Sequence, residues 1–148
     1  MPRTLPLVLT LLLPGVVGAQ VKKEIVPIPG AGNPVLSSVV KVRDMLYLSG
    51  QLGFIPGGRA LAEGGIGPET RQTLENIKRV LEAAGSSMER VVKCTVYLAD
   101  VADFRAMNEV YRTFWPSDPP ARTTVAVAGL VANARIEIEC LALVGTEN

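Results

Sequence analysis

The sequence predicts a single two-layer α+β domain in which two helices cover one face of a mixed β-sheet. First, the periodicity of apolar residues along the chain indicates elements in the order β-β-α-β-α-β-β. Second, each helical pattern carries only one apolar stripe, so each helix can cover a sheet from one side only. Third, 148 residues with 48% hydrophobic and 20% charged side chains suit one ordinary globular domain.

The first 19 residues are predicted to be a secretory signal peptide. Arg3 precedes an apolar stretch over residues 5–13, and small or tolerated residues precede a cleavage site after Ala19. A buried N-terminal strand or a mistaken start codon is the alternative. The apolar run is short for a bilayer span, so we expect no stable membrane insertion after processing. Residues 20–148 would then form the domain of an exported protein, either periplasmic or secreted.

The first two strands are predicted at residues 39–42 and 45–48, with Arg43-Asp44 as the hairpin turn between them. An irregular segment rich in proline and glycine precedes them at residues 27–34. Ser49-Gly50-Gln51 is expected to end the second strand, and a glycine-rich loop then runs to Gly67.

The first helix is predicted between Pro68, which suits the first helical position, and Gly85, which can close the last turn. Its apolar face consists of residues spaced by three or four positions: Leu74, Ile77, Leu81 and Ala84.

A strand at residues 91–98 and a second helix follow. On the strand, alternation places Val92, Cys94, Val96 and Leu98 on one side. Either Asp100 or Asp103 can cap the helix. The apolar residues that share one face of the second helix are Phe104, Met107, Tyr111 and Phe114.

The last two strands are predicted at residues 123–128 and 135–144. On the final strand, Glu137 and Glu139 alternate with Ile136 and Ile138, so the two carboxylates point away from the helices. The sheet face opposite the helices would be left open in a monomer, so we expect it to pack against another subunit of an oligomer. Glu139 is expected to pair with a surface cation. Arg122 lies where a proline-stiffened loop enters the preceding strand.

The absence of histidine restricts the chemistry. It removes the commonest general base and metal ligand, and it excludes Ser–His and Cys–His catalysis. Cys94 and Cys140 are too few and too far apart for a zinc site, so no metal and no cofactor are predicted. The two cysteines could form a disulfide in an oxidising compartment or remain two buried thiols.

Charge argues against a nucleic-acid partner. The formal net charge is +1, and basic residues are interspersed with acidic ones rather than gathered in a block that would follow a phosphate backbone.

Five short strings occur in order along the chain and together resemble the RidA/YjgF family of reactive-intermediate deaminases. The resemblance covers nearly all of residues 20–148. The strings are Ser49-Gly50-Gln51, residues 92–96, Asn108 within residues 104–111, Pro120-Ala121-Arg122, and residues 135–139.

This resemblance implies a chorismate-mutase-like protomer, a homotrimer and sites between adjacent subunits. It implies that Arg122 binds the substrate carboxylate and that Glu137 activates the attacking water. It also implies that backbone near Ser49, Gly50 and Thr124 lines the pocket and that Asn108 supports it. The implied reaction converts small 2-imino or enamine acids, such as 2-aminoacrylate and 2-iminobutanoate, into 2-keto acids and ammonia without a cofactor.

Two departures from the family pattern bear on substrate range. Leu36 stands where many relatives carry a pocket aromatic residue, and Thr124 stands where cysteine is frequent. A non-catalytic trimer with a ligand-binding or chaperone-like role is the alternative function. Nuclease activity is disfavoured because the sequence has no histidine, metal cluster or basic groove.

Overall fold

The computed structural model describes residues 20–30 and 35–145. The predicted signal peptide at residues 1–19 lies outside these ranges. Among the described residues, no helix has the length and apolar character needed to cross a bilayer.

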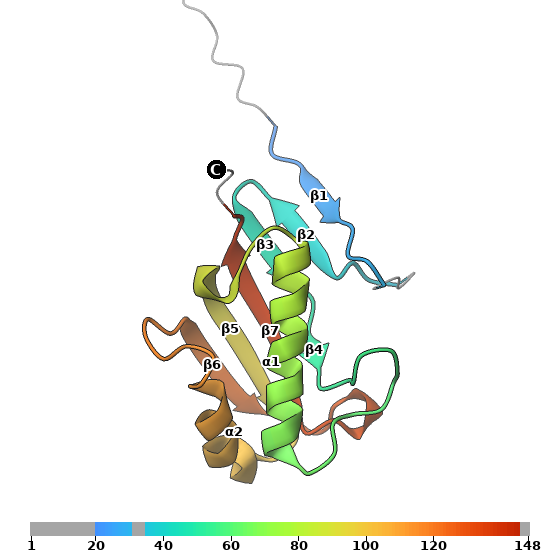
Figure 1. The fold of residues 1–148 in the computed structure, drawn as a ribbon, viewed down its shortest axis with the longest axis vertical. Helices are drawn as coiled ribbons and strands as arrows, with labels where there is room; N and C mark the ends of the chain where they lie inside the picture. Colours follow the sequence, from blue (N-terminus) through green and yellow to red (C-terminus); the bar gives the residue numbers. More distant parts are fainter. Residues whose placement is uncertain (1–19, 31–34, 146–148) are drawn as a thin grey trace, which may run out of the picture.

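The described chain forms one mixed sheet with both helices on the same face (Figure 1). The strand order is β1-β2-β3-β7-β5-β6, and a short β4 also pairs with β7. Only β5 and β6 run parallel. This confirms the predicted α+β class. The strands are β1 (Lys23–Val26), β2 (Val39–Val42), β3 (Met45–Leu48), β4 (Gln51–Leu52), β5 (Val91–Leu98), β6 (Ala121–Ala126) and β7 (Ile136–Leu143), and the helices are α1 (Ile66–Ala83) and α2 (Phe104–Tyr111).

Two strands, β1 and β4, were not predicted. Almost every residue of β1 is exposed, so its sequence carries no burial alternation, and it forms by pairing with the edge of β2. β4 has only two residues, which pair with Glu137 and Ile138 of β7. The predicted hairpin is confirmed, since β2 and β3 have the expected bounds.

Helix α1 is confirmed, but it begins two residues before Pro68, which occupies the third position. Its end is fixed by Gly85, whose φ of +73° favours glycine. The Gly85 N–H donates to the Glu82 carbonyl at 3.1 Å, and the Ser86 N–H donates to the Leu81 carbonyl at 2.8 Å. This pair of bonds is a Schellman motif, which satisfies the last carbonyls of the helix.

A β-bulge corrects the predicted facing of β5. The register with β7 shifts between Val91 and Lys93, so Val92 has no partner and is 40% exposed instead of buried. Val91 and Cys94 both face the core as a result, and Cys94, Val96 and Leu98 keep their predicted side.

The second helix also differs from its predicted apolar face. Met107 and Tyr111 are buried, but Phe104 is 42% exposed at the first position. Asp100 caps the short 3-10 turn before α2, because its carboxylate accepts the Ala102 N–H at 2.9 Å. Asp103 instead makes an ion pair with Arg135 at 2.7 Å.

Cys94 and Cys140 form a disulfide between directly opposed positions of β5 and β7. Both are buried in the core between the sheet and α1. The two bridged cysteines are 46 residues apart in sequence. Of the two alternatives left open by the sequence, the structure has the disulfide.

The sheet face opposite the helices is open in the protomer. Tyr47 and Leu143 expose 44% and 37% of their surface there, beside Glu137 and Glu139. The predicted alternation of β7 is confirmed, since Ile136, Ile138 and Cys140 are buried on the helix side.

Candidate functional site

Arg122 on β6 lies on the helix side of the sheet, against the rings of α2. Its guanidinium carbon lies 4.5 Å from the centroid of the Tyr111 ring and 5.8 Å from that of Phe104. These cation–π contacts hold the side chain in place without neutralising it. Within the described ranges Arg122 has no acidic partner, so its planar set of N–H donors is suited to a carboxylate ligand.

A cavity of about 460 Å³ lies beside Arg122, and the predicted site residue Asn108 also lines it. Two neighbouring polar atoms, the Tyr111 hydroxyl and Thr124 Oγ1, are buried and have no partner among the described residues. Burial raises the pKa of Tyr111 to about 12, so its hydroxyl stays protonated at neutral pH. The cavity is lined by Asn108, Tyr111, Arg112, Trp115, Pro119, Pro120 and Arg122.

Glu137 lies on the opposite, open face of the sheet and is half-buried. Burial, followed by the negative charge of Glu139, raises the pKa of the Glu137 carboxyl. Among the described residues Glu139 has no cationic partner, contrary to the prediction, and its carboxylate accepts the Tyr97 hydroxyl at 3.2 Å. A carboxyl with a raised pKa can exchange protons closer to neutral pH than an ordinary glutamate.

Gly50 is adjacent to this carboxylate and leaves room for it. A Cβ on residue 50 would lie 2.9 Å from Glu137 Cδ and closer still to Oε1. The neighbouring Ser49 hydroxyl is already engaged, donating to the Ser37 carbonyl at 2.7 Å. Ser49 and Gly50 can therefore offer backbone groups near Glu137, but the Ser49 hydroxyl is not poised as a nucleophile.

Within one protomer, the structure brings the predicted residues together as two separate groups. Arg122 and Asn108 share the helix side of the sheet, whereas Glu137 and Gly50 share the open face. Arg122 and Glu137 also lie on strands separated by β5. A sheet blocks contact between side chains on its two faces, so both groups can line one site only if two subunits contribute to it.

Glu69 is a structural residue of the site that the sequence did not reveal. It is 4% exposed, and its Oε1 accepts the backbone N–H of Arg135 at 2.8 Å and that of Ile136 at 3.4 Å. These bonds fix the start of β7 immediately before Glu137. In the sequence Glu69 looks like an ordinary acidic residue in a first helical turn, and nothing there indicates burial.

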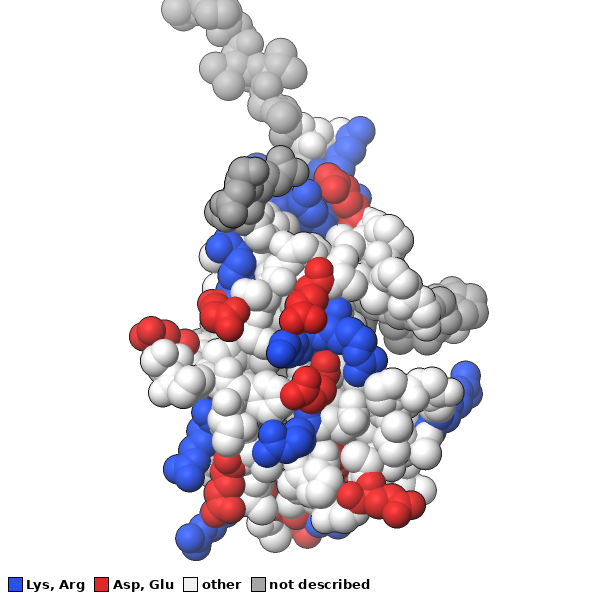
Figure 2. Space-filling model, in the orientation of Figure 1, with Lys and Arg blue, Asp and Glu red and all other residues white. Residues whose placement is uncertain are grey.

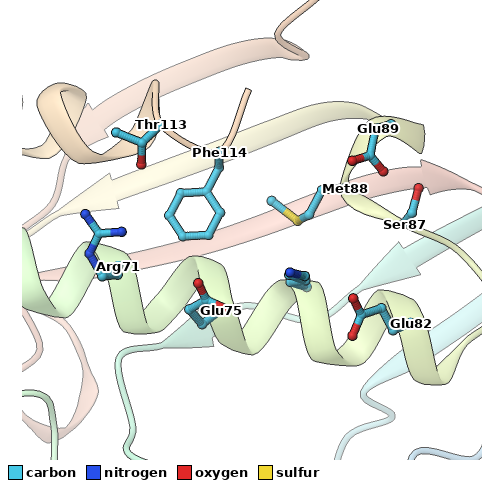
Figure 3. A pocket seen from close by; sticks show the side chains of 9 residues that line it. Arg71, Glu75, Glu82, Ser87, Met88, Glu89, Thr113 and Phe114 are labelled. Carbon is cyan, nitrogen blue, oxygen red and sulfur yellow. The ribbon is translucent and has the colours of Figure 1, made fainter. Parts of the chain in front are cut away.

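The other surface features of the described residues are less suited to a functional site. Acidic and basic side chains alternate over the face shown in Figure 2, without a continuous band of one sign. No group of three or more potential metal ligands occurs in residues 20–30 and 35–145. A second hollow, of about 500 Å³, lies beside α1 and mixes both charges without any predicted site residue (Figure 3). Its lining is Arg71, Glu75, Lys78, Glu82, Ser87, Met88, Glu89, Thr113 and Phe114.

Comparisons with known proteins agree with the resemblance. The family model Ribonuc_L-PSP, described as Endoribonuclease L-PSP, matches residues 30–144. The human 2-iminobutanoate/2-iminopropanoate deaminase is 44% identical over 117 residues, covering 79% of this chain and 85% of the relative. Reactive Intermediate Deaminase A from Arabidopsis thaliana is 42% identical over 127 residues, covering 84% and 67%.

Solved structures show the same fold. A structure described as a putative endoribonuclease L-PSP from Entamoeba histolytica has a TM-score of 0.78 at 36% identity, covering 83% of this chain and 100% of the other. Escherichia coli TdcF with bound serine has a TM-score of 0.73 at 32% identity, covering 81% and 98%.

Proposed function

The chain belongs to the Ribonuc_L-PSP (RidA/YjgF) family, and from this premise we propose that it hydrolyses small 2-imino acids to 2-keto acids and ammonia. The observation that carries the proposal is Arg122, a guanidinium stacked on Tyr111 beside a cavity and without a described acidic partner. The relatives named as imine deaminases support the same reaction. The proposed reaction uses the chain's own side chains and water, without a cofactor.

In the proposed mechanism, Arg122 binds the substrate carboxylate through two parallel N–H donors and fixes the C=N carbon in place. Water adds to this carbon, and Glu137 accepts the proton that the water releases. Glu137 then returns the proton to the amine of the carbinolamine. The C–N bond then breaks and ammonia leaves, while the hydroxyl oxygen forms the keto group and passes its proton to Glu137, which transfers it to the departing ammonia. Iminium and water thereby yield the 2-keto acid and ammonium.

We propose that each site lies between two subunits of a homotrimer, with Arg122 from one subunit and Glu137 from the next. The opposite facing of these two residues in the protomer supports this arrangement, because neither can reach the other through its own sheet. The exposed Tyr47 and Leu143 give the open face an apolar surface that a second copy can cover.

Replacement of Arg122 by alanine tests the proposal. We expect kcat/KM for 2-iminopropanoate to fall at least about a hundredfold, since a paired carboxylate loses its cation. The imine is generated by an amino-acid oxidase, and the remainder is trapped with semicarbazide. Arg71→Ala is the control, because Arg71 lines the other hollow, beside α1, and not the cavity of Arg122. Wild-type protein that leaves the spontaneous decay unchanged would refute the deaminase function.

Mixed oligomers test the shared site in the same assay. Arg122→Ala and Glu137→Gln subunits should each have little activity alone. Random co-assembly of equal amounts should restore an intact pair, Arg122 from one subunit and Glu137 from the next, at about a quarter of the sites. Absence of any recovery in verified mixed oligomers would contradict an intersubunit site.

Gly50→Ala should displace Glu137 with little damage to the fold, because the nearest obstacle to the new methyl group is the end of a flexible side chain. We expect a roughly tenfold to hundredfold lower kcat, as for other small misplacements of a reacting group. The midpoint of thermal unfolding, measured alongside, should change little. Gly58→Ala is the control, since a Cβ there meets its nearest atom at 3.9 Å.

A further inference from the structure

A second arginine, Arg112, lines the same cavity as Arg122 and is exposed. Arg112 directly follows the last residue of α2, and its N–H donates to the Asn108 carbonyl at 3.2 Å. Asn108 and Arg112 are therefore successive residues on one side of the helix end. The cavity wall thus carries two positive charges, and none of its lining residues is acidic.

Neither charge is neutralised by the described part of the protomer. The three ion pairs found there involve other basic residues. Glu109, the acidic residue of α2, lines an adjoining hollow together with Arg105 and Arg112, and its ion pair there is with Arg105, at 3.8 Å. Two guanidinium groups around one cavity repel each other until an anion lies between them, and a dianion relieves that repulsion best.

The cavity also leaves room for a substrate larger than the smallest imino acids. Its volume of about 460 Å³ lies within the range of pockets that enclose whole small-molecule ligands. Trp115, Pro119 and Pro120 supply an apolar wall between the polar groups, which suits the methylene carbons of a short chain.

We propose that Arg112 is a specificity residue and that the site prefers 2-imino dicarboxylates, such as 2-iminoglutarate and 2-iminosuccinate. Arg122 binds the carboxylate beside the C=N carbon, as in the proposed function on which this inference rests. Arg112 binds the carboxylate at the end of the side chain.

The experiment compares kcat/KM for 2-iminoglutarate, generated from D-glutamate by D-aspartate oxidase, with that for 2-iminopropanoate, generated from D-alanine by D-amino-acid oxidase. We expect the wild-type protein to prefer 2-iminoglutarate about tenfold, the effect of one partly exposed charge-assisted contact. Arg112→Gln should abolish this preference and leave 2-iminopropanoate within twofold of wild type. Arg112→Lys should retain part of the preference for 2-iminoglutarate. Arg105→Gln is the matched control, because Arg105 is a neighbouring arginine of α2 that is already paired with Glu109.

A basic residue at this helix end also offsets the helix dipole, which would affect stability but not substrate choice. Equal losses for both substrates in Arg112→Gln, or a wild-type preference for 2-iminopropanoate, would overturn the inference. If no imine is hydrolysed, the proposed function fails. In that case, calorimetric affinities for 2-oxoglutarate and pyruvate test the inference about Arg112 by themselves. Tighter binding of 2-oxoglutarate by the wild type, abolished in Arg112→Gln, would support the inference. Equal affinities for the two keto acids would overturn it.

Discussion

Glu137→Gln should lower kcat for imine hydrolysis about a thousandfold, the usual contribution of a positioned general acid–base group, with only a small change in KM. Glutamine has nearly the same shape as glutamate and fits the space beside Gly50, but it cannot accept a proton from water. In the proposed site, substrate binding depends on Arg122 of the adjacent subunit, so KM should be largely preserved. Steady-state kinetics of the wild-type and variant proteins test this expectation.

Glu139→Gln is the matched control for this substitution. Glu139 lies on the same face of β7, two residues farther on, with its carboxylate bonded to Tyr97. It should keep kcat within a few-fold of wild type. Similar losses in the two variants would show that charge on this face, rather than Glu137 itself, determines the rate.

The pH dependence of kcat/KM should follow the titration of the Glu137 carboxyl. Burial and Glu139 raise the pKa of Glu137, and Tyr97 is the titratable residue opposite it on β5. The base must be ionised, so kcat/KM should fall as the pH drops through this raised pKa. Removal of the neighbouring negative charge in Glu139→Gln should move the acid limb of the pH profile to lower pH. An unchanged limb would contradict the coupling between these two carboxylates.

Loss of the Cys94–Cys140 disulfide should lower the free energy of unfolding by about 4 kcal/mol, the value for a cross-link closing a loop of this length. The bridge restricts the unfolded chain, and in the folded chain it links two adjacent inner strands of the sheet, β5 and β7. Urea unfolding of oxidised protein, reduced protein and Cys94→Ala measures the difference.

A double variant supplies the control. Either single substitution removes the whole cross-link, so Cys140→Ala added to Cys94→Ala should cost much less than the first substitution. Equal midpoints for oxidised and reduced protein would show that the bridge contributes nothing to stability.

We also propose that the protein is exported after cleavage following Ala19. Thiol titration of protein from the oxidising compartment should then detect no free cysteine.

Local sequence patterns predict the elements of this fold but not how the two faces of the sheet present the candidate site residues. Local periodicity correctly placed the hairpin at residues 39–48, helix α1 with its closing Gly85, and the alternation of β7. These features depend on residues close in the chain, whose spacing alone decides which side chains share a face. The family resemblance named Arg122 and Glu137 but could not say how one protomer presents them.

The sequence by itself thus determined the α+β class, the main helices and strands, and the residues on which the chemistry is proposed to depend. The tertiary structure alone decided that Arg122 and Glu137 lie on opposite faces, that Val92 is displaced by a bulge, and that Glu69 holds the start of β7. It also decided that the two cysteines meet. Each of these depends on strand pairing or packing between segments far apart in the chain, and no local pattern specifies such partners.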